Sequence, residues 1–108
     1  SSTAQAERAV AAARGAQERW AALTPANRSV ALLRWAEAIE ADADELAARE
    51  VADTGKPLTV ARDGELPFAV DNLRFFAGAA RSLDGTGAGT LSDGYTSIIT
   101  RRPVGVVT

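Results

Sequence analysis

The stretch DTGKPLTVARDGELPFAVDNLRFFAGAARSL (residues 53–83) decides the fold, because one helix must end inside it and another must begin. A short helix is predicted over residues 43–53. Gly55 ends this helix, since glycine readily takes the left-handed conformation of a helix C-terminal cap. Pro57 then prevents the same helix from continuing, because its ring removes a backbone donor. The next helix is therefore a separate element.

A fourth helical stretch is predicted from about Thr59 to Leu83. Gly64 and Pro67 interrupt its first part, so we expect a kink or two segments there. Apolar residues recur at three- and four-residue steps and predict one buried face. This face consists of Leu66, Leu73, Phe76, Ala77 and Ala80.

Two longer helices are predicted before the quoted stretch. Ser2 with Gln5 fits a capping box, so the first helix is expected over residues 3–23. Thr24 and Pro25 then predict a restart, because threonine caps helices and proline suits the first helical position. The stripe of the first helix consists of Val10, Ala13, Gln17 and Trp20. The buried face of the second consists of Leu32, Trp35, Ala36 and Ile39.

The helices are rich in small side chains, since 24 of the 108 residues are alanine. Alanine contributes little apolar area on burial, so the helices are expected to pack against something larger than themselves. Four aromatic side chains lie at or next to the stripes and are predicted to be core. They are Trp20, Trp35, Phe75 and Phe76.

The sequence changes character after the helices. Residues 84–94 are rich in glycine and are predicted as a flexible connecting loop. Residues 95–102 favour a β-strand, Pro103 breaks the run, and residues 104–107 begin a second β run. The chain ends at Thr108 inside that apolar run, so we expect a segment cut from a longer protein in mid-strand.

Composition excludes several classes of function. The net charge is -2, which provides no basic field for a nucleic-acid backbone. The sequence has no cysteine and no histidine, so a thiolate nucleophile, a disulfide, a Cys/His zinc site and an imidazole base are all excluded within it. No apolar run approaches the roughly 20 residues needed to cross a bilayer, and no signal-peptide pattern opens the chain. We expect neither a nucleic-acid nor a membrane partner.

Two glycine motifs admit a phosphate-binding interpretation, and each has a simpler one. Residues 85–89 (GTGAG) follow a helix, and Thr90 stands where the dinucleotide fingerprint needs glycine. A flexible connector is therefore favoured. Gly55-Lys56 resembles the end of another phosphate loop, but Glu50 occupies its upstream glycine position. A helix end, with lysine near the negative pole of the helix dipole, is favoured there.

A group of acidic residues admits either a metal site or an ordinary solvated helix surface. The solvated surface is favoured, because Arg34 and Arg49 lie three to four residues from acids of this group, a spacing that suits ion pairs along a helix. Asp42 with Glu45 also fits a cap of the short third helix. The acidic group consists of Glu37, Glu40, Asp42, Asp44 and Glu45.

Several blocks resemble, in order and spacing, the N-terminal part of the aldehyde dehydrogenase superfamily. Together they cover nearly the whole chain. They include ERAVAAARGAQERW (residues 7–20), DTGKPL (53–58), LRFFAGAA (73–80) and RPVGVV (102–107). The forms FFAGAARSLDG (75–85) and YTSIITRRPVGVV (95–107) look closest to the branch that contains betaine aldehyde and 4-aminobutyraldehyde dehydrogenases.

The resemblance implies an α/β enzyme of which this chain is the mostly helical part. Residues 1–94 would be the helical N-terminal part of the NAD(P)-binding domain, residues 95–103 a strand of the oligomerisation arm, and residues 104–108 the start of the first core strand. The family oxidises an aldehyde to the acid with NAD or NADP, through a thiohemiacetal on a cysteine. Neither that cysteine nor the cofactor-binding residues fall in this sequence, so no catalytic or cofactor-binding residue is assigned and this chain alone would be inactive.

The resemblance also implies partners and a few site residues. A homo-oligomer, dimer or tetramer, would form through the arm strand, and a cytoplasmic location is expected. Glu65 and Phe68 match positions that line the substrate entrance in relatives, where the aminoaldehyde branch often has two acids. Ordinary packing is an equally good interpretation of both. Asp53 matches an acid that in some relatives helps hold a structural sodium or potassium ion, and a plain helix end is the alternative.

A second interpretation belongs to a different class of protein. The chain would be a complete small helical interaction module with a β arm and no catalytic activity. The reading frame beyond Thr108 separates the two, because an enzyme needs an asparagine-containing turn soon after the strand and a cysteine nucleophile much later.

Overall fold

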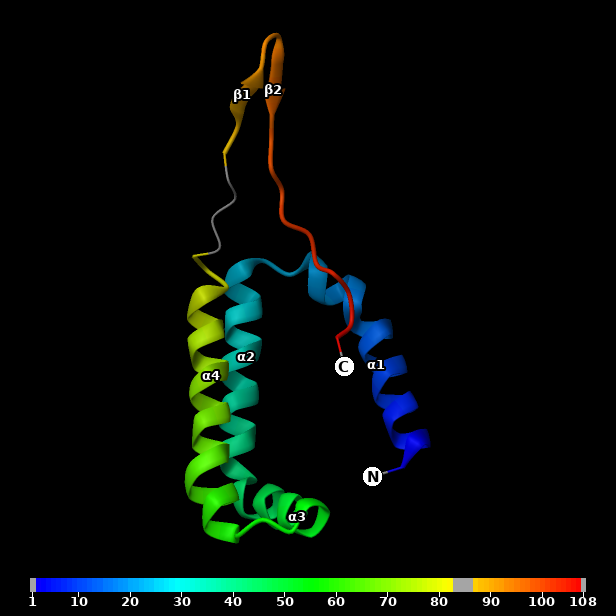
Figure 1. The fold of residues 1–108 in the computed structure, drawn as a ribbon, viewed down its shortest axis with the longest axis vertical. Helices are drawn as coiled ribbons and strands as arrows, with labels where there is room; N and C mark the ends of the chain where they lie inside the picture. Colours follow the sequence, from blue (N-terminus) through cyan, green and yellow to red (C-terminus); the bar gives the residue numbers. More distant parts are fainter. Residues whose placement is uncertain (1, 83–86, 108) are drawn as a thin grey trace.

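The computed structural model describes residues 2–82 and 87–107. Within these residues the chain forms four α-helices, one π-helical segment and a short β-hairpin (Figure 1). The elements are α1 (Thr3–Ala22), α2 (Pro25–Ala41), α3 (Ala43–Thr54), η1 (Val60–Glu65), α4 (Leu66–Ala79), β1 (Gly89–Ser92) and β2 (Tyr95–Ser97). The mostly helical class followed by β-strands is thereby confirmed.

The predicted starts of the two long helices are confirmed by their caps. At α1, the Ser2 hydroxyl accepts from the Gln5 amide at 3.3 Å, and the Gln5 side chain accepts from the Ser2 amide at 2.8 Å. At α2, the Thr24 hydroxyl accepts from the Asn27 amide at 3.3 Å. The cap predicted for α3 is wrong, because Asp42 makes no side-chain capping bond there. The Asp42 amide instead still donates to α2, so the two helices are nearly continuous.

The predicted break before α4 is confirmed and takes the form of a change in helix type. Gly55 ends α3 in the left-handed conformation at φ 75°. The chain then enters η1, and the Leu66 amide donates five residues back to Ala61 as α4 begins. Pro67 sits in the first turn of α4, where its missing amide donor is tolerated. The predicted helix end at Leu83 is wrong, because α4 ends at Ala79 and residues 80–82 form a turn. The start of the predicted loop at Asp84 and Gly85 lies outside the described residues.

The core is made of small side chains. Helices α2 and α4 lie side by side and run in opposite directions, with α3 across their lower end (Figure 1). The Arg74 guanidinium on α4 donates twice to the Glu40 carboxylate on α2, at 2.8 and 2.5 Å. No large side chain of the described residues is fully buried. The buried residues are Ser29, Ala36, Ala47, Ala61, Val70 and Ala77.

The prediction that the large aromatic side chains form the core is wrong for this chain. Trp35 is 58% exposed, Phe75 67% and Phe76 59%, and Trp20 on α1 is 40% exposed. Helix α1 has no buried residue at all. The stripes of α2 and α4 are covered only at their small members, since Ala36 and Ala77 are buried while Trp35 and Phe76 are exposed. The radius of gyration, 18.8 Å, exceeds the roughly 13 Å of a compact domain of this length.

The C-terminal part of the chain contains a β-hairpin, and the predicted bounds of its loop and strand are wrong. Residues 89–92, predicted as loop, form β1, which pairs antiparallel with β2 around Asp93 and Gly94. The strand predicted over residues 95–102 is limited to Tyr95–Ser97, and the run over 104–107 has no strand partner. A strand exists only where a second strand supplies hydrogen bonds, which these residues lack here. In the described part of the chain, no helix combines the length and apolarity needed to span a membrane.

Candidate functional site

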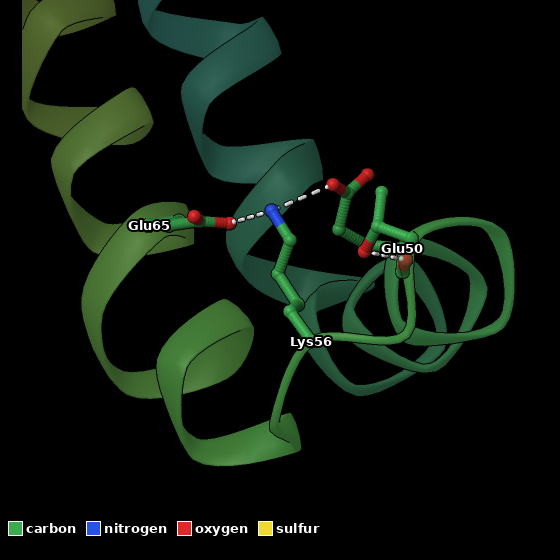
Figure 2. A network of polar contacts seen from close by, with 4 residues as sticks. Glu50, Lys56 and Glu65 are labelled. Carbon is green, nitrogen blue, oxygen red and sulfur yellow. Dashed lines mark hydrogen bonds and ion pairs between the residues drawn. The ribbon is translucent and has the colours of Figure 1, made fainter.

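The turn between α3 and η1 places one cation between two carboxylates (Figure 2). Gly55 reverses the chain, and Pro57 starts the following helical segment by accepting from the Val60 amide at 3.1 Å. Lys56, between them, points across the turn. Its ammonium lies 2.8 Å from Glu50 of α3 and 2.6 Å from Glu65 at the end of η1. We call Glu50, Lys56 and Glu65 the lysine bridge.

The lysine bridge is half-buried and electrostatically matched. The Lys56 side chain is 24% exposed, against 47% for Glu50 and 51% for Glu65. Hydrogen bonds to Glu50 and then to Glu65 raise the pKa of Lys56 above its ordinary value. Thr54 closes the end of α3 beside it, since its hydroxyl donates to the Glu50 carbonyl at 2.7 Å. The bridge therefore links α3 to η1 across the turn that carries Lys56, and the Lys56 ammonium compensates the negative charge of Glu65.

Glu65 and Phe68, the predicted substrate-entrance residues, occupy different surroundings. Glu65 lines an open groove of about 440 Å³ whose walls are largely apolar. Phe68 does not line that groove, and its side chain is 71% exposed. The remaining lining residues are Trp35, Ile39, Leu46, Glu50, Ala61, Leu66 and Ala69. Of the two residues, Glu65 borders this groove and Phe68 does not.

Asp53, the predicted ligand of a monovalent cation, is exposed in the last turn of α3. Over residues 2–82 and 87–107, the structure has no group of three or more acidic side chains placed to hold a metal ion. Asp44 and Glu45 pair with Arg62 and Arg49.

Sequence reasoning placed Lys56 at a helix end but missed its partners. Lys56 and Glu65 are nine residues apart, and Lys56 and Glu50 are separated by a helix cap. Neither spacing is one at which helical neighbours meet. The sequence predicted that the chain changes direction at Gly55-Lys56-Pro57, but it did not predict the angle between α3 and η1. The same holds for the pair between Arg74 and Glu40, which joins two helices.

The arrangement can position polar groups and attract a charged ligand, and its own sequence supplies neither a thiolate nor an imidazole. A carboxylate beside an ammonium at an apolar groove is suited to hold a polar or cationic ligand end. The 108 residues contain no cysteine and no histidine. Thiolate or imidazole chemistry at this groove would have to come from residues outside this sequence.

The sequence was compared with protein-family models and with known proteins. Residues 1–108 match the model of the family described as "Aldehyde dehydrogenase family". The chain is 36% identical over 101 residues to an aldehyde dehydrogenase of Paracoccus denitrificans, covering 94% of this chain and 20% of that protein. It is 40% identical over 103 residues to the NADP/NAD-dependent aldehyde dehydrogenase PuuC of Escherichia coli, covering 94% and 21%.

A solved structure agrees with the sequence comparison. The crystal structure of PnpE in complex with nicotinamide adenine dinucleotide matches with a TM-score of 0.68 and 34% identity, over 86% of this chain and 19% of that one. The chain thus spans about a fifth of the length of the curated relatives that it matches. Since the family model matches the chain along its whole length, this chain belongs to the aldehyde dehydrogenase family.

Proposed function

We propose that this chain serves in a longer enzyme that oxidises an aldehyde to the carboxylic acid with NAD or NADP. The observation that carries the proposal is the match of the family model to residues 1–108. The relative PuuC is named for both cofactors, and PnpE was solved with NAD. When bound, the nicotinamide would accept the hydride from the substrate carbon. The comparisons give no support to a stand-alone interaction module.

Within such an enzyme, we assign the chain a scaffolding part. Residues 1–94 would belong to the helical layer of the NAD(P)-binding domain, and residues 104–108 would lead into its sheet. The cofactor and the cysteine would be held by the rest of the longer protein. The exposed aromatic side chains of α2 and α4 support this assignment, because they form a face that needs an apolar cover.

The hairpin would supply the arm through which subunits pair. Tyr95 is 73% exposed, Ile98 70% and Ile99 50%. Exposed apolar residues beside a two-stranded sheet favour pairing with a further strand. Residues 95–103 would therefore join a sheet of a second copy in a homo-oligomer.

The substrate would be an aldehyde with a cationic end, such as an aminoaldehyde or betaine aldehyde. Glu65 supports this class by its carboxylate at the rim of an apolar groove. Phe68 would contribute an apolar or cation–π contact at the same entrance once the rest of the protein surrounds it. Because Lys56 already compensates Glu65, the preference for a cation is expected to be moderate.

The test uses the full-length protein that contains this chain. Reduction of NAD⁺ and NADP⁺ is followed at 340 nm with 4-aminobutyraldehyde, betaine aldehyde and a neutral aldehyde of similar length. Aldehyde-dependent reduction of either cofactor supports the oxidoreductase, and a higher kcat/KM for the cationic aldehydes supports the substrate class. Absence of reduction with every aldehyde contradicts the proposed activity.

A further inference from the structure

A cluster of three arginines lies apart from the lysine bridge, where α1 meets the start of α2 and the C-terminal segment. One hollow of about 430 Å³ is lined by Arg28, Arg101 and Arg102. Figure 1 shows the C-terminal segment passing beside the end of α1 that leads into α2. The segment and the helix approach closely, since a Cβ built on Gly105 would lie 3.7 Å from the Gln17 side chain. The other lining residues are Gln17, Trp20, Ala21, Pro103 and Gly105.

The hollow concentrates positive charge without a compensating acid. No carboxylate lines it, and none of the three guanidiniums forms an ion pair with an acidic side chain of the described residues. Arg28 is fixed at the hollow, because its guanidinium donates to the Leu23 carbonyl at 2.5 Å. Elsewhere on this acidic chain, Arg62 and Arg74 each have acidic partners. Three arginines that line one space favour an anion there.

We propose that this hollow binds a small molecule through a phosphate or diphosphate group. A single carboxylate would compensate only one of the three charges, whereas a phosphate monoester carries about −1.5 to −2 near neutral pH. The planar guanidinium also matches phosphate oxygens in a bidentate manner. The hollow falls within the roughly 300–1,000 Å³ of small-molecule sites. Trp20, 40% exposed in its wall, offers an aromatic face to the rest of the ligand.

The proposal goes beyond aldehyde oxidation and is tested by binding alone. Pyrophosphate and ADP are titrated by calorimetry into the full-length protein at low ionic strength with the cofactor site saturated by NAD⁺ or NADP⁺, for the wild type and for Arg28→Gln, Arg101→Gln and Arg102→Gln. We expect saturable binding, with Kd raised at least tenfold in each variant, because each loses a charged hydrogen-bonding group. Arg8→Gln is the matched control. It makes the same charge change about 14 Å along α1 from Gln17 and should alter Kd less than twofold.

The two ligands separate the possible sources of phosphate. Equal affinities indicate a site for inorganic diphosphate, and tighter ADP indicates an organic phosphate that also uses Trp20; either result supports the proposal. Arg101 and Arg102 lie outside helices and strands, so their variants keep the test valid if Arg28→Gln unfolds the α1–α2 junction. No saturable binding, binding unchanged in all three variants, or an equal loss in Arg8→Gln would overturn it. A hollow filled by an acidic side chain of the longer protein gives the first of these results.

Discussion

The left-handed turn at Gly55 can be tested by one chemical change made at two glycines. Gly55 has φ 75°, and an alanine there would have its Cβ too close to the following carbonyl, at a cost of roughly 1–2 kcal/mol. Gly15 lies inside α1, and a Cβ added there meets nothing within 4 Å. Gly15→Ala should therefore stabilise the helix by about 0.5–1 kcal/mol, because alanine is the better helix former. The same methyl group thus has opposite effects at the two positions.

The assay is urea unfolding of the full-length protein that contains this chain, followed by circular dichroism at 222 nm. With a dependence of roughly 1–3 kcal/mol per molar urea, a loss of roughly 1–2 kcal/mol in Gly55→Ala should lower the midpoint by roughly 0.3–2 M. Gly15→Ala should raise it by a smaller amount. The Gly55 amide donates to Val51 at 2.8 Å, so part of the loss would come from fraying of α3. Midpoints that move in the same direction, or an unchanged midpoint for Gly55→Ala, would refute the assigned turn.

Three further outcomes are expected. Lys56→Met should destabilise the protein by an amount that stays constant from neutral pH to about pH 10, because the raised pKa of Lys56 keeps the wild-type side chain charged in that range. Above about pH 10 the difference in stability between variant and wild type should shrink. Urea midpoints measured as a function of pH would show this. Glu65→Gln in the full-length enzyme should raise KM for cationic aldehydes more than for neutral ones, with Glu7→Gln as control; equal effects would remove Glu65 from the entrance. Thermal melting of the full-length protein in sodium, potassium and choline chloride at equal ionic strength tests Asp53, and identical curves would argue against a bound cation.

Local signals predicted helix ends better than they predicted what the helices contact. The capping box at Ser2, the Thr24-Pro25 start and the Gly55 cap depend on residues within one turn, and each is confirmed. Asp42 shows where such a signal fails. Its backbone already continues α2, so its side chain does not cap α3.

The hairpin was missed although its signal was present. Asp93-Gly94 is a two-residue connection between β-prone runs, a strong hairpin indication, and Gly94 has φ 78°. The glycine content of residues 84–94 favoured a loop over the whole stretch, although four of these residues form β1. The lysine bridge had no comparable signal. It depends on the angle between α3 and η1, which no spacing along the sequence encodes.

The aromatic side chains predicted as core are exposed, and the total surface of the chain indicates how much apolar cover they would need. The accessible surface is 8561 Å², whereas a folded monomer of 11.2 kDa would have about 5,700 Å². The excess of about 2,900 Å² is several times the roughly 800 Å² that each partner loses in a standard protein interface. A small transient partner would leave most of it in water. A cover on the scale of a domain interior fits better, and it agrees with the alanine core between α2 and α4, which brings two helices close while leaving Trp35, Phe75 and Phe76 for a second layer.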